Sequence, residues 1–223
     1  MQTVRRALKA ATVVAALSIV TAPSLSAAQA MPVLDKAVAA WAKVKSLSGT
    51  FEQTLTNPLL RTTTTSHGEY QQQRPNKLAI RYTDPAGDAI VADGKYIWVY
   101  LPQAAPNQVR KLSAADNVDI PIDMSQFLDR ATERYDIVGG GMQRVGTRSA
   151  RLLTLTPRKG RQSLFTNALV WVDDADGLIR QFEVTETSGV VRRIRLTVIT
   201  VNPAFNASEF SFVVPKGAKV IDP

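Results

Sequence analysis

The stretch DAIVADGKYIWVYL, residues 88–101, decides the fold class because it contains two strands and the turn that joins them. Asp93-Gly94 is a strong hairpin signal, since these two residue types accept the positive φ angles of a two-residue turn. The runs on either side, residues 88–92 and 95–101, are rich in apolar, β-branched and aromatic side chains. We therefore predict two antiparallel strands here, within a larger sheet.

The second of these strands is apolar on both of its faces. Successive side chains of a strand point to opposite sides of the sheet. Here the two alternating sets are Tyr96, Trp98 and Tyr100 on one face and Ile97, Val99 and Leu101 on the other. An antiparallel sheet with one face in water does not need this pattern. Either both faces are covered by other parts of the chain, or one face lines an apolar cavity.

Short runs of the same kind recur along most of the chain, separated by turn signals about every 8–12 residues. This spacing is typical of an all-β sandwich or barrel. Besides the two strands above, we expect strands at residues 49–56, 68–73, 77–83, 108–112, 134–138, 151–156, 168–172, 179–187, 190–201 and 209–214.

Two segments follow the helical period instead. Residues 32–47 have apolar side chains at helical spacing, with Pro32 in the first turn. Residues 119–132 place Met124, Phe127, Leu128 and Ala131 on one face of a short amphipathic helix. Two apolar helix faces beside a long antiparallel sheet predict an α+β domain in which the sheet wraps the helices.

The first residues have the pattern of a secretory signal peptide. Arg5, Arg6 and Lys9 precede an apolar run at residues 10–22, and small residues follow at 28–30. The apolar run is shorter than the roughly 20 residues that a membrane-spanning helix needs. We therefore expect the leader to end at Ala30 and the mature chain to be a soluble periplasmic protein.

Residues 31–223 are long enough for one domain with a sizeable core. The formal charge of the chain is +8, and removal of the three leader cations leaves +5. The remaining cations are scattered, so nucleic acid is not an expected partner, and we expect a monomer. The chain has no cysteine, which excludes a thiolate nucleophile, a disulfide framework and a lipid-modified N-terminal cysteine.

The sequence offers little material for catalysis or for a metal site. His67 is the single histidine and lies in a Thr/Ser-rich turn, where no partner that would orient a general base can be identified. Asp174, Asp176, Gly177 and Glu183 match part of a calcium loop. However, the first ligand position of that loop is apolar and its flanks resemble strands, so a hairpin turn explains the same residues.

The three consecutive glycines at residues 139–141 fit a flexible turn better than a phosphate loop, because no lysine with Ser or Thr follows them. We therefore expect no enzymatic activity, no cofactor and no metal. What remains is apolar surface beyond the needs of a simple sheet, which favours a protein that binds an apolar ligand. The other interpretation is that both apolar faces are ordinary core.

Short motifs in a fixed order along the chain resemble one known family. They are Phe51-Glu52-Gln53, Gly68 with Arg74-Pro75, Tyr82 with Pro85, Val91 with Asp93-Gly94, Trp98 with Tyr100, Leu155 with Pro157, and Phe210, Phe212, Pro215 and Gly217 near the C-terminus. No one motif is specific, but the ordered set spans nearly the whole mature chain. It resembles the periplasmic outer-membrane lipoprotein carrier family, LolA.

This resemblance implies an α+β fold, an unclosed antiparallel β-barrel of about 11 strands with helices covering its concave face. It also implies a periplasmic chaperone whose cavity takes the acyl chains of lipoproteins. The expected partners are the inner-membrane ABC transporter that releases lipoproteins and the receptor on the outer membrane. Two alternatives remain open on the same fold, which are a carrier of another lipid or glycolipid and an interaction module that senses lipoproteins.

The resemblance also assigns site residues. The arginine before proline, Arg74, is expected to hydrogen-bond a lid at residues 122–130 when the cavity is empty. The residues expected to line the cavity or the lid are Phe51, Leu78, Ile80, Trp98, Met124, Phe127 and Leu128. Many relatives carry Phe-Arg-Trp where this chain has Leu78-Ala79-Ile80, which leaves partner docking and the cargo open.

Overall fold

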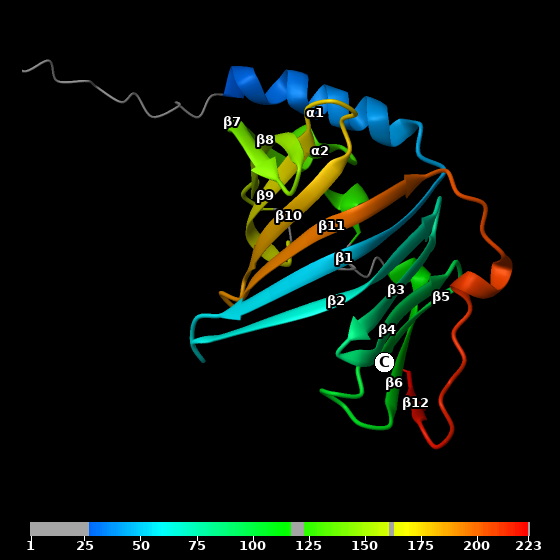
Figure 1. The fold of residues 1–223 in the computed structure, drawn as a ribbon. Coiled ribbons are helices and arrows are strands. Elements are labelled where there is room, and N and C mark those ends of the chain that lie inside the picture. The colour runs from blue at the N-terminus through cyan, green and yellow to red at the C-terminus, as the bar shows by residue number, and fades with distance from the viewer. Residues whose placement is uncertain (1–26, 117–122, 161–162, 223) are drawn as a thin grey trace, which may run out of the picture.

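The computed structural model describes residues 27–116, 123–160 and 163–222. They form one curved sheet of 12 strands that half encloses a long helix and several short helical turns (Figure 1). The strands are β1 (Ser46–Asn57), β2 (Thr62–Gln73), β3 (Lys77–Asp84), β4 (Ala86–Asp93), β5 (Tyr96–Tyr100), β6 (Gln108–Ser113), β7 (Tyr135–Val145), β8 (Arg148–Pro157), β9 (Phe165–Asp173), β10 (Ile179–Glu186), β11 (Val191–Val201) and β12 (Lys219–Ile221). The helices are α1 (Ala27–Ala42), α2 (Ala131–Arg134) and three 3-10 turns, η1 (Ala114–Asp116), η2 (Met124–Phe127) and η3 (Ala207–Phe210).

The sheet consists of two meanders that meet in its middle. Its strand order is β12-β6-β5-β4-β3-β2-β1-β11-β10-β9-β8-β7. Every pair is antiparallel except β12 with β6. Because β7 and β12 lie at opposite ends of this order and do not pair, the barrel is unclosed. The predicted architecture is confirmed, with 12 strands in place of about 11.

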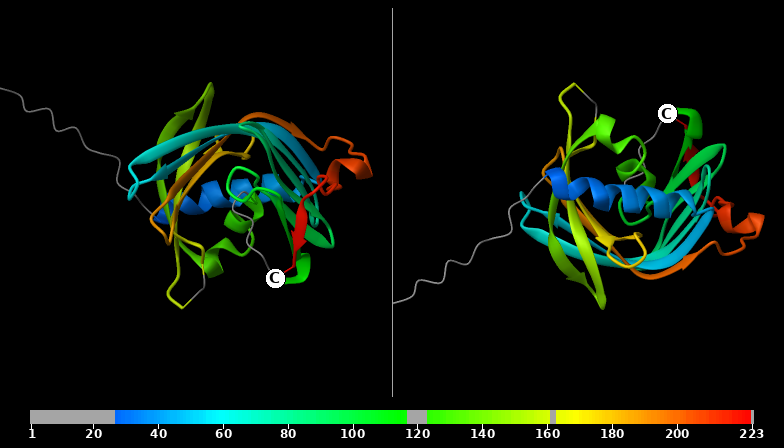
Figure 2. Two further views of the ribbon diagram at one scale, coloured as in Figure 1. Left: turned by 90° about the horizontal axis from the view of Figure 1, so that it is seen from below. Right: turned by 90° about the horizontal axis from the view of Figure 1, so that it is seen from above.

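The concave face of the sheet carries the main apolar core. Helix α1 lies across this face (Figure 2) and buries Ala30, Leu34, Ala37 and Trp41 against it. Side chains from both meanders join the same cluster, because alternate residues of each strand point inward. The core therefore sits between the sheet and its helical cover.

The convex face has a smaller cover of its own, which explains why β5 is apolar on both sides. After β11 the chain crosses to the outside of β3 and β4, where η3 packs and Phe210 is buried against Ala79 and Val91. The strand that we predicted at residues 209–214 is therefore wrong. An Asn206 capping box stabilises η3 instead, and the chain after it is irregular up to β12.

Two helix predictions also need correction. Helix α1 runs from Ala27 to Ala42, so it begins and ends earlier than residues 32–47. The segment at 119–132 is not one helix. Residues 117–122 lie outside the described part, and the rest is η2 and α2, separated by Arg130 at φ 49°. A left-handed residue interrupts the helical hydrogen bonds.

The glycines at residues 139–141 do not form a turn, as we predicted, but lie inside β7. A Cβ at Gly139 would lie 2.7 Å from Ala30 N of α1. The glycine therefore allows the helix to approach the strand closely. No helix within the described residues is long and apolar enough to cross a membrane.

Candidate functional site

The concave face and the turn η2 that covers it form the candidate site. Phe51, Leu78 and Ile80 point from β1 and β3 into the same buried cluster as Met124 and Phe127 of η2. Leu128, which follows η2, is also in this cluster. Each of these six side chains is at most 6% exposed. The residues predicted from the sheet and from the lid thus lie together, apart from Trp98.

Trp98 lies on the opposite face, so its assignment to the cavity is corrected. Its ring stacks on Phe212 of the C-terminal segment, with 5.7 Å between ring centroids. Its indole Nε1 donates to Asp93 Oδ2 at 2.9 Å. Because neighbouring strand residues point to opposite faces, Ile97 takes the concave position instead.

We use "lid" for residues 123–128, which include η2. One end of the lid is held by a polar chain from β2. Tyr70 donates to Gln72 Oε1 at 2.9 Å, and Gln72 Nε2 donates to Asp123 Oδ1 at 3.4 Å. The same Asp123 carboxylate caps η2 by accepting from Ser125 N at 2.9 Å. Burial first, and the Asp123 charge second, raise the pKa of Tyr70 well above its ordinary value, so the phenol stays a donor.

The other end of the lid is held through one backbone oxygen. Gln126 O accepts from Arg134 Nη1 and from the Tyr135 hydroxyl, both at 3.0 Å. The lid is therefore packed by apolar side chains and fastened by a few bonds at its two ends. Such contacts can be exchanged for a ligand without breaking a strand pair.

Arg74 makes no bond to residues 123–130 of the expected lid, and residue 122 lies outside the described part of the chain. Its Nη1 donates to Trp41 O at 3.1 Å and to Val44 O at 3.5 Å, at the end of α1. The guanidinium also lies over the Trp41 ring, 5.8 Å from its centroid. The carbonyls at a helix end lack partners within the helix, so a cation there is stabilising.

Two pockets flank the lid, and Gln126 lines both. One, of about 440 Å³, lies between the lid and strands β3 to β5, and Leu78, Ala92 and Ile97 form part of its wall. The other, of about 290 Å³, lies at the start of β9 and the end of β10 and is lined by Phe165, Val184 and Arg192, among others.

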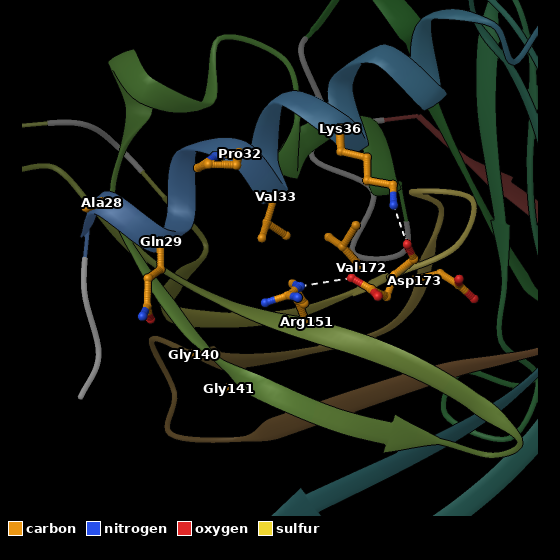
Figure 3. A pocket seen from close by; sticks show the side chains of 11 residues that line it. Ala28, Gln29, Pro32, Val33, Lys36, Gly140, Gly141, Arg151, Val172 and Asp173 are labelled. Carbon is orange, nitrogen blue, oxygen red and sulfur yellow. Dashed lines mark hydrogen bonds and ion pairs between the residues drawn. The ribbon is translucent and has the colours of Figure 1, made fainter. Parts of the chain in front are cut away.

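A third pocket, of about 600 Å³, lies between the first turns of α1 and strands β7 to β9 (Figure 3). Its two cations are already paired. Arg151 Nε donates to Asp174 Oδ1 at 2.9 Å, and Lys36 Nζ donates to the Asp174 backbone oxygen. Because its charges are satisfied within the chain, this pocket is a weaker candidate for the site.

Sequence reasoning missed a polar row on the concave face. Gln53 Oε1 accepts from the Tyr82 hydroxyl at 3.2 Å and from Arg192 Nη1 at 3.1 Å. Arg192 also pairs with Glu186 at 2.9 Å. Burial raises the pKa of Tyr82, more than the nearby Arg192 lowers it. The available signal was a polar residue at an inward position of β1, because Gln53 follows the inward Phe51 by two residues.

Two of the carboxylates that matched part of a calcium loop, Asp174 and Asp176, lie in the β9–β10 turn, whereas Glu183 lies in β10 and pairs with Arg193. Asp174 pairs with Arg151, and Asp176 pairs with Arg148 and Arg180. No group of three or more potential metal-ligating side chains occurs within residues 27–116, 123–160 and 163–222.

His67 also lies outside the concave face, near two carboxylates. Its Nε2 lies 3.8 Å from Glu52 Oε2, and its Nδ1 lies 3.7 Å from Asp84 Oδ2. The same Glu52 carboxylate pairs with Arg195 at 3.0 Å. His67 is exposed and sits on the side of β2 opposite the buried Gly68 and Tyr70. The lone histidine therefore takes no part in the candidate site.

Comparison with known proteins gives one consistent result. The family model described as outer membrane lipoprotein carrier protein LolA matches residues 42–213. The outer-membrane lipoprotein carrier protein of Aeromonas salmonicida (strain A449) is 30% identical over 183 residues, which cover 81% of this chain and 84% of the relative. That of Bordetella avium (strain 197N) is 28% identical over 90% of this chain and 91% of the relative. A solved structure of an uncharacterized conserved protein from Thermus thermophilus shares the fold, with a TM-score of 0.55 and 13% identity over 86% of this chain and 98% of that one.

Proposed function

Because this chain belongs to the outer membrane lipoprotein carrier protein family, LolA, we propose that it receives the acyl chains of lipoproteins on the concave face of its sheet, beneath the lid. The family is periplasmic and consists of carriers without enzymatic activity. The chain is accordingly a lipoprotein carrier. The location of the acyl site, the lining residues and the proteins that exchange cargo with it are our proposals.

One observation carries the choice of site. The lid buries three large apolar side chains, Met124, Phe127 and Leu128, on an apolar sheet, yet few polar bonds fasten it. Each buried methylene contributes about 0.8 kcal/mol, so a 16-carbon acyl chain gains roughly a dozen kcal/mol on the same surface. Acyl chains can therefore replace the lid, and the lid can cover the surface again after release.

The proposed partners follow from the transport of lipoproteins between two membranes. A carrier that moves lipoproteins between two membranes takes its cargo from the inner-membrane ABC transporter that releases it and delivers it to the outer-membrane receptor. In this structure Leu78 and Ile80 are buried on the concave face, and Ala79 lies under Phe210 on the convex face. These three residues are not aromatic, and none of them offers an exposed side chain to which a partner protein could dock.

The chain organisation remains a proposal as well. We propose that residues 31–223 act as one carrier domain after removal of a leader that ends at Ala30. The family match at residues 42–213 lies inside that domain and supports it.

A cross-link across the lid tests the acyl site. The chain has no cysteine, so Gln72→Cys with Asp123→Cys creates a unique pair at positions whose side chains now meet at 3.4 Å. Joining the pair with a short thiol reagent should hold the lid on the sheet. We expect the cross-linked protein to show only background binding of a triacylated lipoprotein that is supplied by dilution out of detergent. Binding should return when a reducible cross-linker between the two cysteines is cleaved.

The matched control joins Glu183→Cys and Arg193→Cys, which replace an exposed ion pair of 2.6 Å between β10 and β11. Binding should survive this second link. If the lid-linked protein carries lipoprotein as well as the control does, the acyl site lies elsewhere. If mass spectrometry finds a glycolipid instead of a lipoprotein on the periplasmic protein, the cargo assignment fails.

A further inference from the structure

The polar row on the concave face holds unused hydrogen-bonding atoms beside an apolar floor. Glu186, Arg192, Gln53, Tyr82 and Asp88 come from β10, β11, β1, β3 and β4 in turn. Asp88 belongs to the row because it alternates onto the same face as Ile90 and Ala92, and because its charge acts on Tyr82. The row therefore crosses the sheet from one meander to the other.

Two atoms of this row lack a partner among the described residues. Gln53 Oε1 accepts both hydrogen bonds to this side chain, so the Nε2 amide donor has no partner among the described residues, and it keeps some contact with solvent. Asp88 Oδ1 is buried without a hydrogen bond. A buried oxygen without a partner, such as Asp88 Oδ1, costs about 1–3 kcal/mol, which a fold does not need on an otherwise apolar face. One free donor and one free acceptor are what a ligand with both kinds of group would use.

The charges of the row select the kind of head group. Arg192 is neutralised by Glu186, with Nε at 3.2 Å and Nη2 at 2.9 Å from the same carboxylate oxygen. Asp88 adds a further acidic group, so the row carries no net positive charge. An anionic phosphate would lack a free cation here, whereas neutral ester and amide groups fit.

We propose that this row binds the glyceryl ester carbonyls and the amide of the acylated N-terminal residue of the lipoprotein, while the acyl chains lie on the adjacent floor. The pocket of about 290 Å³ next to Arg192, with apolar walls at Phe165 and Val184, is where the chains pass the row. Gln53 Nε2 donates to an ester oxygen, and Asp88 Oδ1 accepts from an amide N–H. This inference rests on the proposed function.

The test compares two probes that differ only in the ester oxygens. One is a synthetic tripalmitoyl-cysteinyl lipopeptide, and the other has its glyceryl chains joined by ether links, which removes the carbonyl acceptors. Gln53→Glu keeps an acceptor for Tyr82 and Arg192 but removes the free donor. We expect the natural chain to prefer the ester probe, and Gln53→Glu to lower its affinity for that probe by about three- to tenfold while leaving the ether probe unchanged.

Arg193→Met is the matched control, because Arg193 is the next residue of β11, points to the convex face and pairs with Glu183. It should change neither affinity. Equal binding of both probes by the natural chain, or an equal loss of both in Gln53→Glu, overturns the inference while leaving a carrier. Binding of neither probe by the natural chain overturns the proposed function itself. Tighter binding of phosphatidylglycerol vesicles than of the ester probe also contradicts the row's selectivity.

Discussion

Asp173 is 1% exposed at the end of β9, and its charge depends on the groups around it. Burial alone raises the pKa of this carboxyl. Hydrogen bonds from Arg148, Arg180 and two backbone N–H groups outweigh burial and lower the pKa to about 2. Because the folded pKa lies below the unfolded value of 3.8, the ionised group stabilises the fold above about pH 4. That contribution disappears as the pH falls through about 2.

We predict that Asp173→Asn lowers the free energy of unfolding by about 2 kcal/mol at pH 6, and that the deficit shrinks as the pH falls from 4.5 to 2. Urea unfolding of both proteins across this range measures it. Asp174→Asn, which changes an exposed neighbour, should cost less than about 1 kcal/mol. A deficit that stays constant with pH would show that the aspartate acts through packing and not through its charge.

Arg74 gives a second prediction at the scale of one residue. Its guanidinium joins the end of α1 to the β2–β3 turn, so Arg74→Leu should lower the free energy of unfolding by about 1 kcal/mol. The lid bonds through Gln72 and Arg134 do not involve it. Lipoprotein uptake should therefore persist, as measured by co-purification, with Arg144→Leu as an exposed control. An unchanged stability together with a blocked transfer would restore a latch role for Arg74.

At the scale of the element, the packing of α1 on β7 depends on Gly139. A Cβ there would lie 2.7 Å from Ala30 N and 2.8 Å from Gln29 C, and backbone atoms cannot move aside as a flexible side chain can. We predict that Gly139→Ala lowers the unfolding free energy by about 1–3 kcal/mol in a chain that starts at Ala27. The same substitution should cost little in a chain that starts at Met31, which lacks the clashing residues.

Thermal unfolding of the four proteins measures this coupling, and Met142→Ala, an exposed change on the same strand, is the control. An equal cost in both chain lengths would mean that the first turn of α1 does not rest on Gly139. The proposed leader takes part in this contact, because cleavage after Ala30 removes Gln29 and Ala30, which lie against Gly139.

The elements differ in how far the sequence could predict them. The alternation of apolar and polar residues located most strands within a few residues, because a strand with one buried face repeats this pattern every two residues. It could not locate the break at Arg130, since arginine is not a residue type that favours the left-handed region. It also predicted a strand at residues 209–214, because the aromatic residues of an irregular cover alternate as those of a strand do.

At the scale of the whole molecule, the family pattern predicted a site on the concave face, but only the structure shows which side chains lie on which face. Trp98 and Ile97 are adjacent and both apolar, and only the register of β5 between β4 and β6 decides which one faces the core. The polar row was hidden for a similar reason. Its residues are far apart in the sequence and are collected by the pairing of β1 with β11.

That pairing also has a consequence for how the chain folds. Most strands of each meander pair with a neighbour in sequence, so these contacts close short loops and form early. The seam between β1 and β11 joins Leu47 to Val201. If the chain is exported from its N-terminus, β1 waits with an unpaired edge until β11 emerges. An open edge strand is a template for aggregation, so the last step of folding is also the step at which a general periplasmic chaperone would have most to protect.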